Sequence, residues 1–217
     1  MPPRRDAFAL ALNALRHRLR QGVDAPGDAL PIQTIADDLR LSTTPVREAL
    51  SRLAGERLVD KRGPTYTRPR PDGPTLAALY DLRLVYLTAA LGRRIERRDG
   101  VRRAPLELLA VARAQAVGAG AAAMVEALFL DLMRGGDDGV LFQAYQPLAD
   151  RLAPFAALED VVLQDVGQDA SALVAAVQAG RTAELRRALR RHHRVRMTQA
   201  AQIARLADGE RYRTDMI

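Results

Sequence analysis

The stretch from Ile35 to Leu53 reads IADDLRLSTTPVREALSRL. Its apolar residues recur at helical spacing both before and after residues 40–42, where the pattern is interrupted. Ser42 is a favourable N-cap for the second half, and Pro45 falls in the first helical turn, where a missing amide donor costs little. The stretch therefore predicts two short helices joined by a tight turn.

The flanking residues extend this pair into a small domain. Residues 6–21 predict a helix that ends at Gly22, and residues 61–67 predict a turn followed by a short β hairpin. Three helices followed by a basic hairpin is the order of a winged helix-turn-helix, in which the last helix enters the DNA major groove. Residues 68–74 read RPRPDGP, whose prolines and glycine exclude a helix or a central strand and indicate a linker.

The rest of the chain has a helical period almost throughout. Helical segments are predicted at residues 75–99, 105–117, 119–134, 139–152, 155–167, 169–179 and 181–208, separated by proline or glycine. The Ala- and Gly-rich residues 116–125 fit either a packing seam or a dimer face. The predicted fold is mostly α, with a winged helix-turn-helix at residues 1–70, a Pro-rich linker at 71–75 and an antiparallel helical bundle at 76–217.

The composition narrows the classes of function. The chain has 217 residues, a net charge of +7, three histidines and no cysteine. Without cysteine there is no disulfide framework, Cys-type zinc site or Cys nucleophile. The longest uncharged stretch, residues 114–125, is shorter than a membrane span, so no transmembrane helix is expected. No constellation of acids, histidines or an activated nucleophile is evident, so the chain is not expected to be an enzyme.

The predicted third helix carries polar residues on one face. Thr44, Arg47 and Ser51 lie opposite the apolar Val46 and Leu50. An arginine can read a guanine edge or hold a phosphate, and the amides at a helix N-terminus suit a phosphate. The predicted wing adds four positive charges, at residues 61, 62, 68 and 70. Spacing and charge alone leave DNA binding and an ordinary solvated surface equally open.

The run STTPVREAL at residues 42–50 resembles the DNA-binding domain of GntR-family bacterial transcription regulators, and the resemblance covers about residues 8–68. The helical remainder, which opens with LYDLR at residues 79–83, resembles the FCD effector domain of the FadR-like branch. The resemblance implies a cytoplasmic homodimer that binds an inverted-repeat operator in double-stranded DNA. It also implies a small-molecule effector, such as an organic acid, in the helical domain. The residues expected to contact DNA are Gln33, Ser42, Thr43, Thr44, Arg47, Ser51, Arg62 and Gly63.

The sequence departs from the family pattern in its DNA-binding domain. Gln33 and Thr43 stand where many members carry arginines that touch DNA, so only Arg47 remains of that trio. Arg57 replaces the usual glycine. We expect an altered sequence preference or weaker binding. The alternative is a helical interaction or ligand-binding protein whose DNA-binding domain is vestigial.

The resemblance to FCD domains also raises the question of a bound metal. FCD domains commonly bind a divalent metal through one Asp and three His. Here only His192 matches, and the aligned positions hold Ala170 and approximately Val125 and Phe129. No metal or other cofactor is therefore expected.

Arg83 and His192 are the expected effector-binding residues. Arg83 would need a partner inside the bundle, either a distant acid or a ligand carboxylate. His192 is either a pocket donor or a helix histidine satisfied by a neighbour or by water. The arginines from Arg186 to Arg196 are expected to form a solvated surface.

Overall fold

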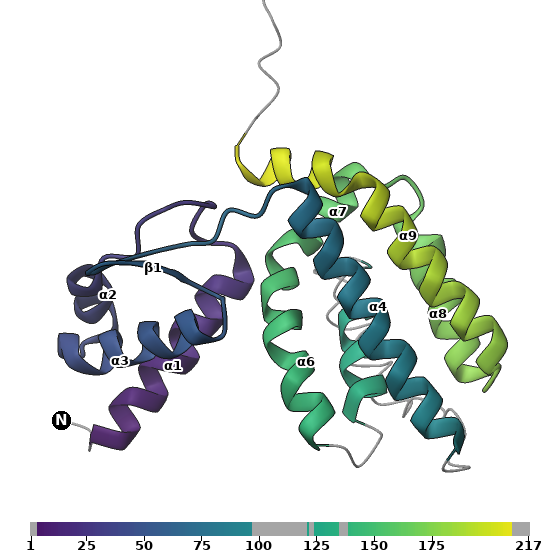
Figure 1. Ribbon diagram of the computed structural model, residues 1–217, viewed down its shortest axis with the longest axis horizontal. Helices are drawn as coiled ribbons and strands as arrows, with labels where there is room; N and C mark the ends of the chain where they lie inside the picture. The colour runs from purple at the N-terminus through teal and green to yellow at the C-terminus, as the bar shows by residue number, and fades with distance from the viewer. Residues whose placement is uncertain (1–3, 97–120, 122–123, 135–138, 210–217) are drawn as a thin grey trace, which may run out of the picture.

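The structure, a computed structural model, describes residues 4–96, 121, 124–134 and 139–209. Two helical bodies lie side by side (Figure 1). The first contains α1 (Arg4–Gln21), α2 (Ile32–Leu39), α3 (Thr43–Gly55), β1 (Asp60–Arg62) and β2 (Thr65–Thr67). The helices of the second body follow in the chain. The predicted fold class, mostly helical with one small sheet after the helix-turn-helix, is confirmed.

The tight turn between α2 and α3 is formed by residues 40–42. Arg40 has φ 54°, a left-handed conformation that ends α2, and the amide of Leu41 donates to the carbonyl of Ala36 at 2.9 Å. Ser42 is extended and occupies the N-cap position of α3, as predicted, although its side chain makes no capping hydrogen bond. The turn therefore sets the orientation of α3 relative to α2.

The first body has its own apolar core, in which α1 packs against α3. Helix α3 contributes Val46, Ala49, Leu50 and Leu53, which are completely buried. Their spacing of three and four residues is the helical period that the sequence shows. The other buried apolar residues of this core are Ala11, Leu15, Leu19, Leu30, Ile35, Ala36, Leu58, Val59 and Tyr66.

The hairpin is a two-stranded antiparallel sheet in which Lys61 pairs with Tyr66. Gly63, at φ 58°, lies at its turn. The segment before α2 adds a third, short pairing, because the amide of Leu30 donates to the carbonyl of Tyr66 at 2.8 Å. The buried Tyr66 ring anchors this wing to the core.

The second body is an antiparallel bundle (Figure 1). Its named elements are α4 (Gly73–Glu96), α6 (Gly139–Leu152), the 3-10 turn η1 (Ala153–Phe155), α7 (Ala156–Val162), α8 (Val166–Gln178) and α9 (Thr182–Ala207). Residues 124–134 are also helical. Helices α4 and α9 pack together extensively, and a second apolar core extends between them, α6 and α8.

The beginning of α4 requires a glycine. A Cβ atom at Gly73 would lie 2.7 Å from the Cα of Ala201 in α9. A Cβ atom would clash with the backbone of α9 at that distance, so α4 can begin there only with a glycine. Helix α4 therefore includes the last three residues of the linker expected at 71–75.

Residues Gly73–Arg93 of α4 have the length and mean hydropathy, 1.2, of a membrane-spanning helix. The sequence-based expectation of no such segment overlooked them. In the structure they form a bundle helix whose Leu76, Tyr80, Leu87 and Leu91 are buried against neighbouring helices. The buried charge of Arg83 interrupts this apolar run.

Most predicted helices of the bundle have structural counterparts. The segments at 139–152, 169–179 and 181–208 agree with α6, α8 and α9 to within a few residues. The segment at 155–167 is shorter, because α7 ends at Val162 and Leu163 is extended. The predicted helix at 105–117 and most of residues 116–125 lie outside the described residues.

The two bodies meet where α1 packs against α6 and η1. The buried carboxylate of Asp150, on α6, accepts hydrogen bonds from the guanidinium groups of Arg16 and Arg20 on α1. Arg16 also donates to Glu56, just beyond α3, at 2.7 Å. One charged group of the bundle is thus connected to the C-terminal end of α3.

Candidate functional site

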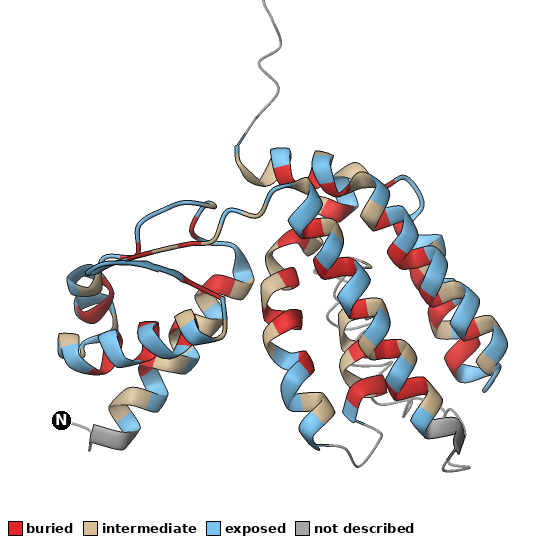
Figure 2. Ribbon diagram, in the orientation of Figure 1, coloured by how far each residue is buried: buried red, intermediate tan, exposed pale blue. Residues whose placement is uncertain are grey.

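Helix α3 presents a polar face to solvent (Figure 2). Thr44, Arg47 and Ser51 are exposed on it, whereas Val46 and Leu50 on the opposite side are buried. Arg47 forms no ion pair or hydrogen bond with any residue that the structure describes. Its guanidinium group is therefore available to a partner.

The N-terminus of α3 lies at the same surface. Ser42 and Thr44 are exposed, and Thr43 is half-buried. Because the Ser42 side chain does not cap the helix, the positive end of the helix dipole is open to an anion. A DNA phosphate is an anion of suitable size for this position.

Two of the predicted DNA contacts are held by neighbouring residues. The Ser51 hydroxyl lies 2.7 Å from the Tyr66 hydroxyl, which links α3 to the wing. The Gln33 amide donates to Asp37 on the same helix at 2.9 Å. Both hydrogen bonds must be exchanged or shared before these side chains can contact a base.

The wing carries fewer available charges than its sequence predicts. Arg62 and Gly63 are exposed at the turn, and Lys61 lies over the Tyr66 ring, 5.7 Å from its centroid. Arg68, in contrast, is buried and donates to the carbonyl of Asp24, and Arg70 donates to Asp208 at 2.8 Å. Of the four charges predicted for the wing, Arg68 is thus buried, and Arg70 is exposed but paired with Asp208.

A second group of polar residues lies inside the bundle. We call it the polar cluster; its members are Arg83, Glu126, Glu159, Asp169, His192, His193 and Arg196. They come from α4, the helix at 124–134, α7, α8 and α9. Five helices thus contribute to two hydrogen-bonded groups, which meet where the rings of His192 and His193 lie 5.0 Å apart.

Arg83 occupies one side of the polar cluster. Its Nε donates to Nε2 of His193 at 3.1 Å, and its Nη1 lies 3.2 Å from Oε2 of Glu126. His193 in turn donates from Nδ1 to the carbonyl of Leu189 at 2.7 Å. The partner that the sequence could not identify for Arg83 is therefore a distant acid together with a neutral histidine.

Arg196 occupies the other side. Its Nε donates to Oε2 of Glu159 at 2.6 Å, and its Nη1 lies 3.2 Å from Oδ2 of Asp169. The hydroxyl of Tyr80 donates to the second oxygen of Glu159 at 2.8 Å. The prediction that this arginine belongs to a solvated surface is wrong, since Arg196 is 1% exposed.

The histidines of the polar cluster are neutral. Burial lowers the pKa of His192 and of His193 well below the usual range, and the nearby arginines act in the same direction. His192 donates from Nδ1 to Asp169 at 2.6 Å. Burial raises the pKa of Asp169, and Arg196 opposes that rise. His192 is thus the helix histidine satisfied by a neighbour, with Nε2 left as an acceptor.

Sequence reasoning found Arg83 and His192 but missed their partners. Glu126, the partner of Arg83, and Asp169, the partner of His192, are separated from them by many residues, and nothing in a single sequence pairs such positions. Arg196 did carry a signal, because it continues the stripe of Leu185, Leu189 and His192 at helical spacing. That stripe identifies it as a buried arginine.

The polar cluster does not fit a divalent metal. In the part of the chain that the structure describes, no three His, Asp or Glu residues come together as a ligand set. Ala170, Val125 and Phe129, which stand at aligned ligand positions, are buried and apolar. That the protein binds no metal stays a prediction.

The comparisons with known proteins agree with this arrangement. Residues 11–64 match the family described as bacterial regulatory proteins, gntR family. The matched segment includes α2, α3 and β1. No match was found among curated proteins.

Solved structures share the fold over nearly the whole chain. Escherichia coli McbR/YncC has a TM-score of 0.70 at 21% identity, with 93% of this chain and 99% of that protein covered. A GntR transcriptional regulator of Rhodococcus sp. RHA1 has a TM-score of 0.66 at 20% identity, with coverages of 90% and 97%. Residues 11–64 therefore match a GntR-type DNA-binding domain, and the chain as a whole shares the fold of these solved structures.

Proposed function

We propose that this chain is a cytoplasmic, dimeric regulator that binds an inverted-repeat operator through α3 and the wing and responds to a small metabolite in its bundle. The observation that carries this proposal is the exposed, unpaired Arg47 beside an uncapped helix N-terminus. Two such helices related by a two-fold axis would enter successive major grooves. Thr43 and Thr44 would hold phosphates, and Arg62 and Gly63 would touch the backbone beside the groove.

Arg47→Ala should weaken operator binding by about 5- to 150-fold, or 1–3 kcal/mol, because a base contact is lost while the fold is retained. The operator is first selected from random duplexes with the purified protein, and affinities are then measured by fluorescence anisotropy. Arg187→Ala, which removes an exposed arginine from α9, is the matched control.

An equal loss in both variants would show a general charge effect and contradict the assignment of Arg47. The salt dependence of affinity tests the alternative of a vestigial domain. Phosphate contacts give a steep fall of affinity with salt, whereas a vestigial domain gives none. The internal hydrogen bonds of Gln33 and Ser51 are the observation that favours this alternative.

An apolar stripe on α4 supports a homodimer. Ala78, Leu82, Val85 and Ala89 share one face of the helix and are all exposed, Val85 at 57%. Exposed stripes of this kind mark sites of association. A second copy with the same stripe would cover it in an isologous contact.

Val85→Asp should convert the dimer to a monomer, because a charge would be buried in an apolar contact without a partner. Sedimentation equilibrium measures the mass directly. Val140→Asp, at an exposed valine on α6 away from the stripe, should leave the dimer intact. If Val85→Asp remains dimeric, the interface lies elsewhere.

The bundle is proposed to be an FCD-type effector domain. A groove of about 510 Å³ between the α7–α8 turn and α9 reaches Asp169 and Arg196 of the polar cluster. The space within the cluster is only about 10 Å³, which suits at most one water molecule. The carboxylate of an organic acid would therefore have to displace Glu126 from Arg83, and His192 Nε2 would accept a hydrogen bond from a hydroxyl group of that acid.

A further inference from the structure

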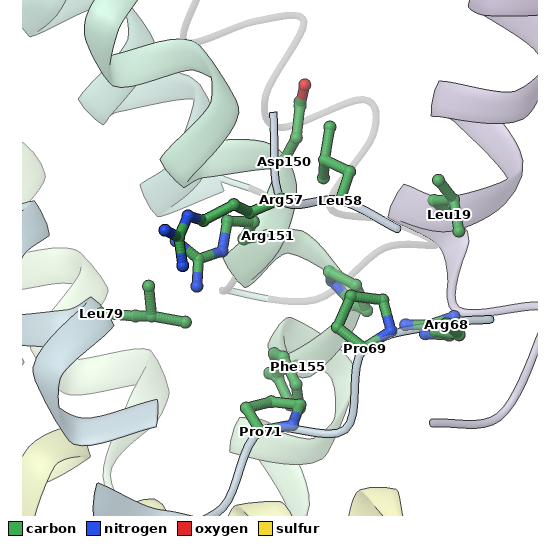
Figure 3. Close-up of a pocket in the computed structure, with 11 residues that line it drawn as sticks. Leu19, Arg57, Leu58, Arg68, Pro69, Pro71, Leu79, Asp150, Arg151 and Phe155 are labelled. Carbon is green, nitrogen blue, oxygen red and sulfur yellow. The ribbon is translucent and has the colours of Figure 1, made fainter. Parts of the chain in front are cut away.

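A cavity of about 50 Å³ lies between the two bodies, away from the α3 face and from the polar cluster (Figure 3). Its apolar wall includes Leu19 from the first body and Leu79, Pro154 and Phe155 from the bundle. The volume is several times what one water molecule needs, and it suits a small polyatomic ion.

Two arginines from different bodies line this cavity. Arg57 lies just beyond α3, and Arg151 lies in the last turn of α6. Figure 3 shows their side chains next to each other, with both guanidinium groups directed into the cavity. Burial lowers the pKa of Arg151, the positive charge of Arg57 lowers it further, and the negative charge of Asp60 opposes both effects.

Among the described residues, no carboxylate lies within ion-pair distance of these two cations, and Asp60 acts on Arg151 only through its more distant charge. Neither Arg57 nor Arg151 makes a hydrogen bond or ion pair with any described residue. The one acid that lines the cavity, Asp150, is bonded to Arg16 and Arg20, and its carboxylate points away from the pair (Figure 3). Arg151 is partly buried and Arg57 is exposed, and two adjacent cations repel each other unless an anion lies between them.

The backbone at Arg57 is also unusual. Its φ is 58°, in the left-handed region where glycine is relaxed and other residues are strained. The conformation is fixed by the end of α3, because the amide of Leu58 donates to the carbonyl of Leu53 at 3.0 Å. Strain of this kind persists mainly where a side chain has a function. Here the strained residue directs its side chain into the cavity.

We propose that this cavity binds a small oxyanion, a phosphate or a carboxylate, which Arg57 and Arg151 hold between the two bodies. Guanidinium groups bind such anions through paired hydrogen bonds. One cation comes from the DNA-binding body and the other from the bundle. The bound anion stabilises the arrangement of the two bodies, and this site is independent of an effector inside the bundle.

The test uses the full-length protein, titrated with inorganic phosphate and separately with acetate, by calorimetry at constant ionic strength. Saturable binding is expected, and Arg57→Gly and Arg151→Gln should each weaken it by about tenfold or more. Arg57→Gly should do so without lowering Tm, since glycine relieves the strained φ. Arg187→Gln, at an exposed arginine outside the cavity, should bind as the wild type does.

Each result decides the proposal. Binding of phosphate alone identifies a phosphate site, and binding of acetate alone identifies a carboxylate site. Failure of both anions to bind overturns the proposal. So does binding that survives both cavity variants, or that is lost equally in Arg187→Gln, because the loss would then be a general effect of charge.

Discussion

Arg196→Met is expected to lower the free energy of unfolding by about 3–5 kcal/mol. Arg196 is 1% exposed, and its guanidinium group bridges Glu159 and Asp169. Without it, the buried carboxylate of Glu159 and the partly buried carboxylate of Asp169 lose their cation. Removing one partner of a buried ion pair costs far more than replacing the whole pair by apolar residues. A loss of this size is a large part of the stability of a typical domain.

Urea unfolding followed by circular dichroism measures the change. Arg194→Met, an exposed neighbour on the same helix, should alter the free energy of unfolding by less than about 0.5 kcal/mol. Adding Glu159→Gln to Arg196→Met should recover part of the loss, because it removes one unpaired charge and keeps an acceptor for Tyr80. If Arg196→Met and Arg194→Met lower the free energy of unfolding equally, the ion pairs of Arg196 do not stabilise the fold.

The contrast between Arg194 and Arg196 shows how far the sequence can predict this fold. The helices follow from periodicity, since burial of one face every three to four residues leaves its mark on the residue types. The helical period also places Arg194 and Arg196 on different faces of α9, whereas their charge alone suggests that both are exposed. Patterns within one helix are thus predictable, provided that a polar residue in an apolar stripe is read as buried.

Contacts between distant segments leave no such mark. Asp150 looks like an ordinary acid in the last turns of an amphipathic helix, yet it accepts hydrogen bonds from Arg16 and Arg20 in the other body. Likewise, Arg57 looks like a surface residue until the left-handed backbone and Arg151 are seen beside it. The polar face of α3 was predicted correctly as an exposed face because it depends only on local spacing.

Asp150→Asn should uncouple the two bodies. Asp150 is 2% exposed and serves two arginines, and an amide offers one acceptor oxygen without charge. We expect a loss of about 1.5–3 kcal/mol, the usual contribution of hydrogen bonds to charged groups. Because each body has its own apolar core, the loss should appear in calorimetry as a separation of one unfolding transition into two.

Asp165→Asn, at an exposed acid preceding α8, is the matched control and should unfold as the wild type does. If Asp150→Asn also retains a single transition, apolar packing of α1 against α6 and η1 is enough to hold the bodies together. The charge of Arg20 also opposes the burial-induced rise in the pKa of Glu126, so the pair at Asp150 and the polar cluster share one electrostatic environment. Separation of the transitions would show that the hydrogen bonds of Asp150 to Arg16 and Arg20 couple the unfolding of the two bodies.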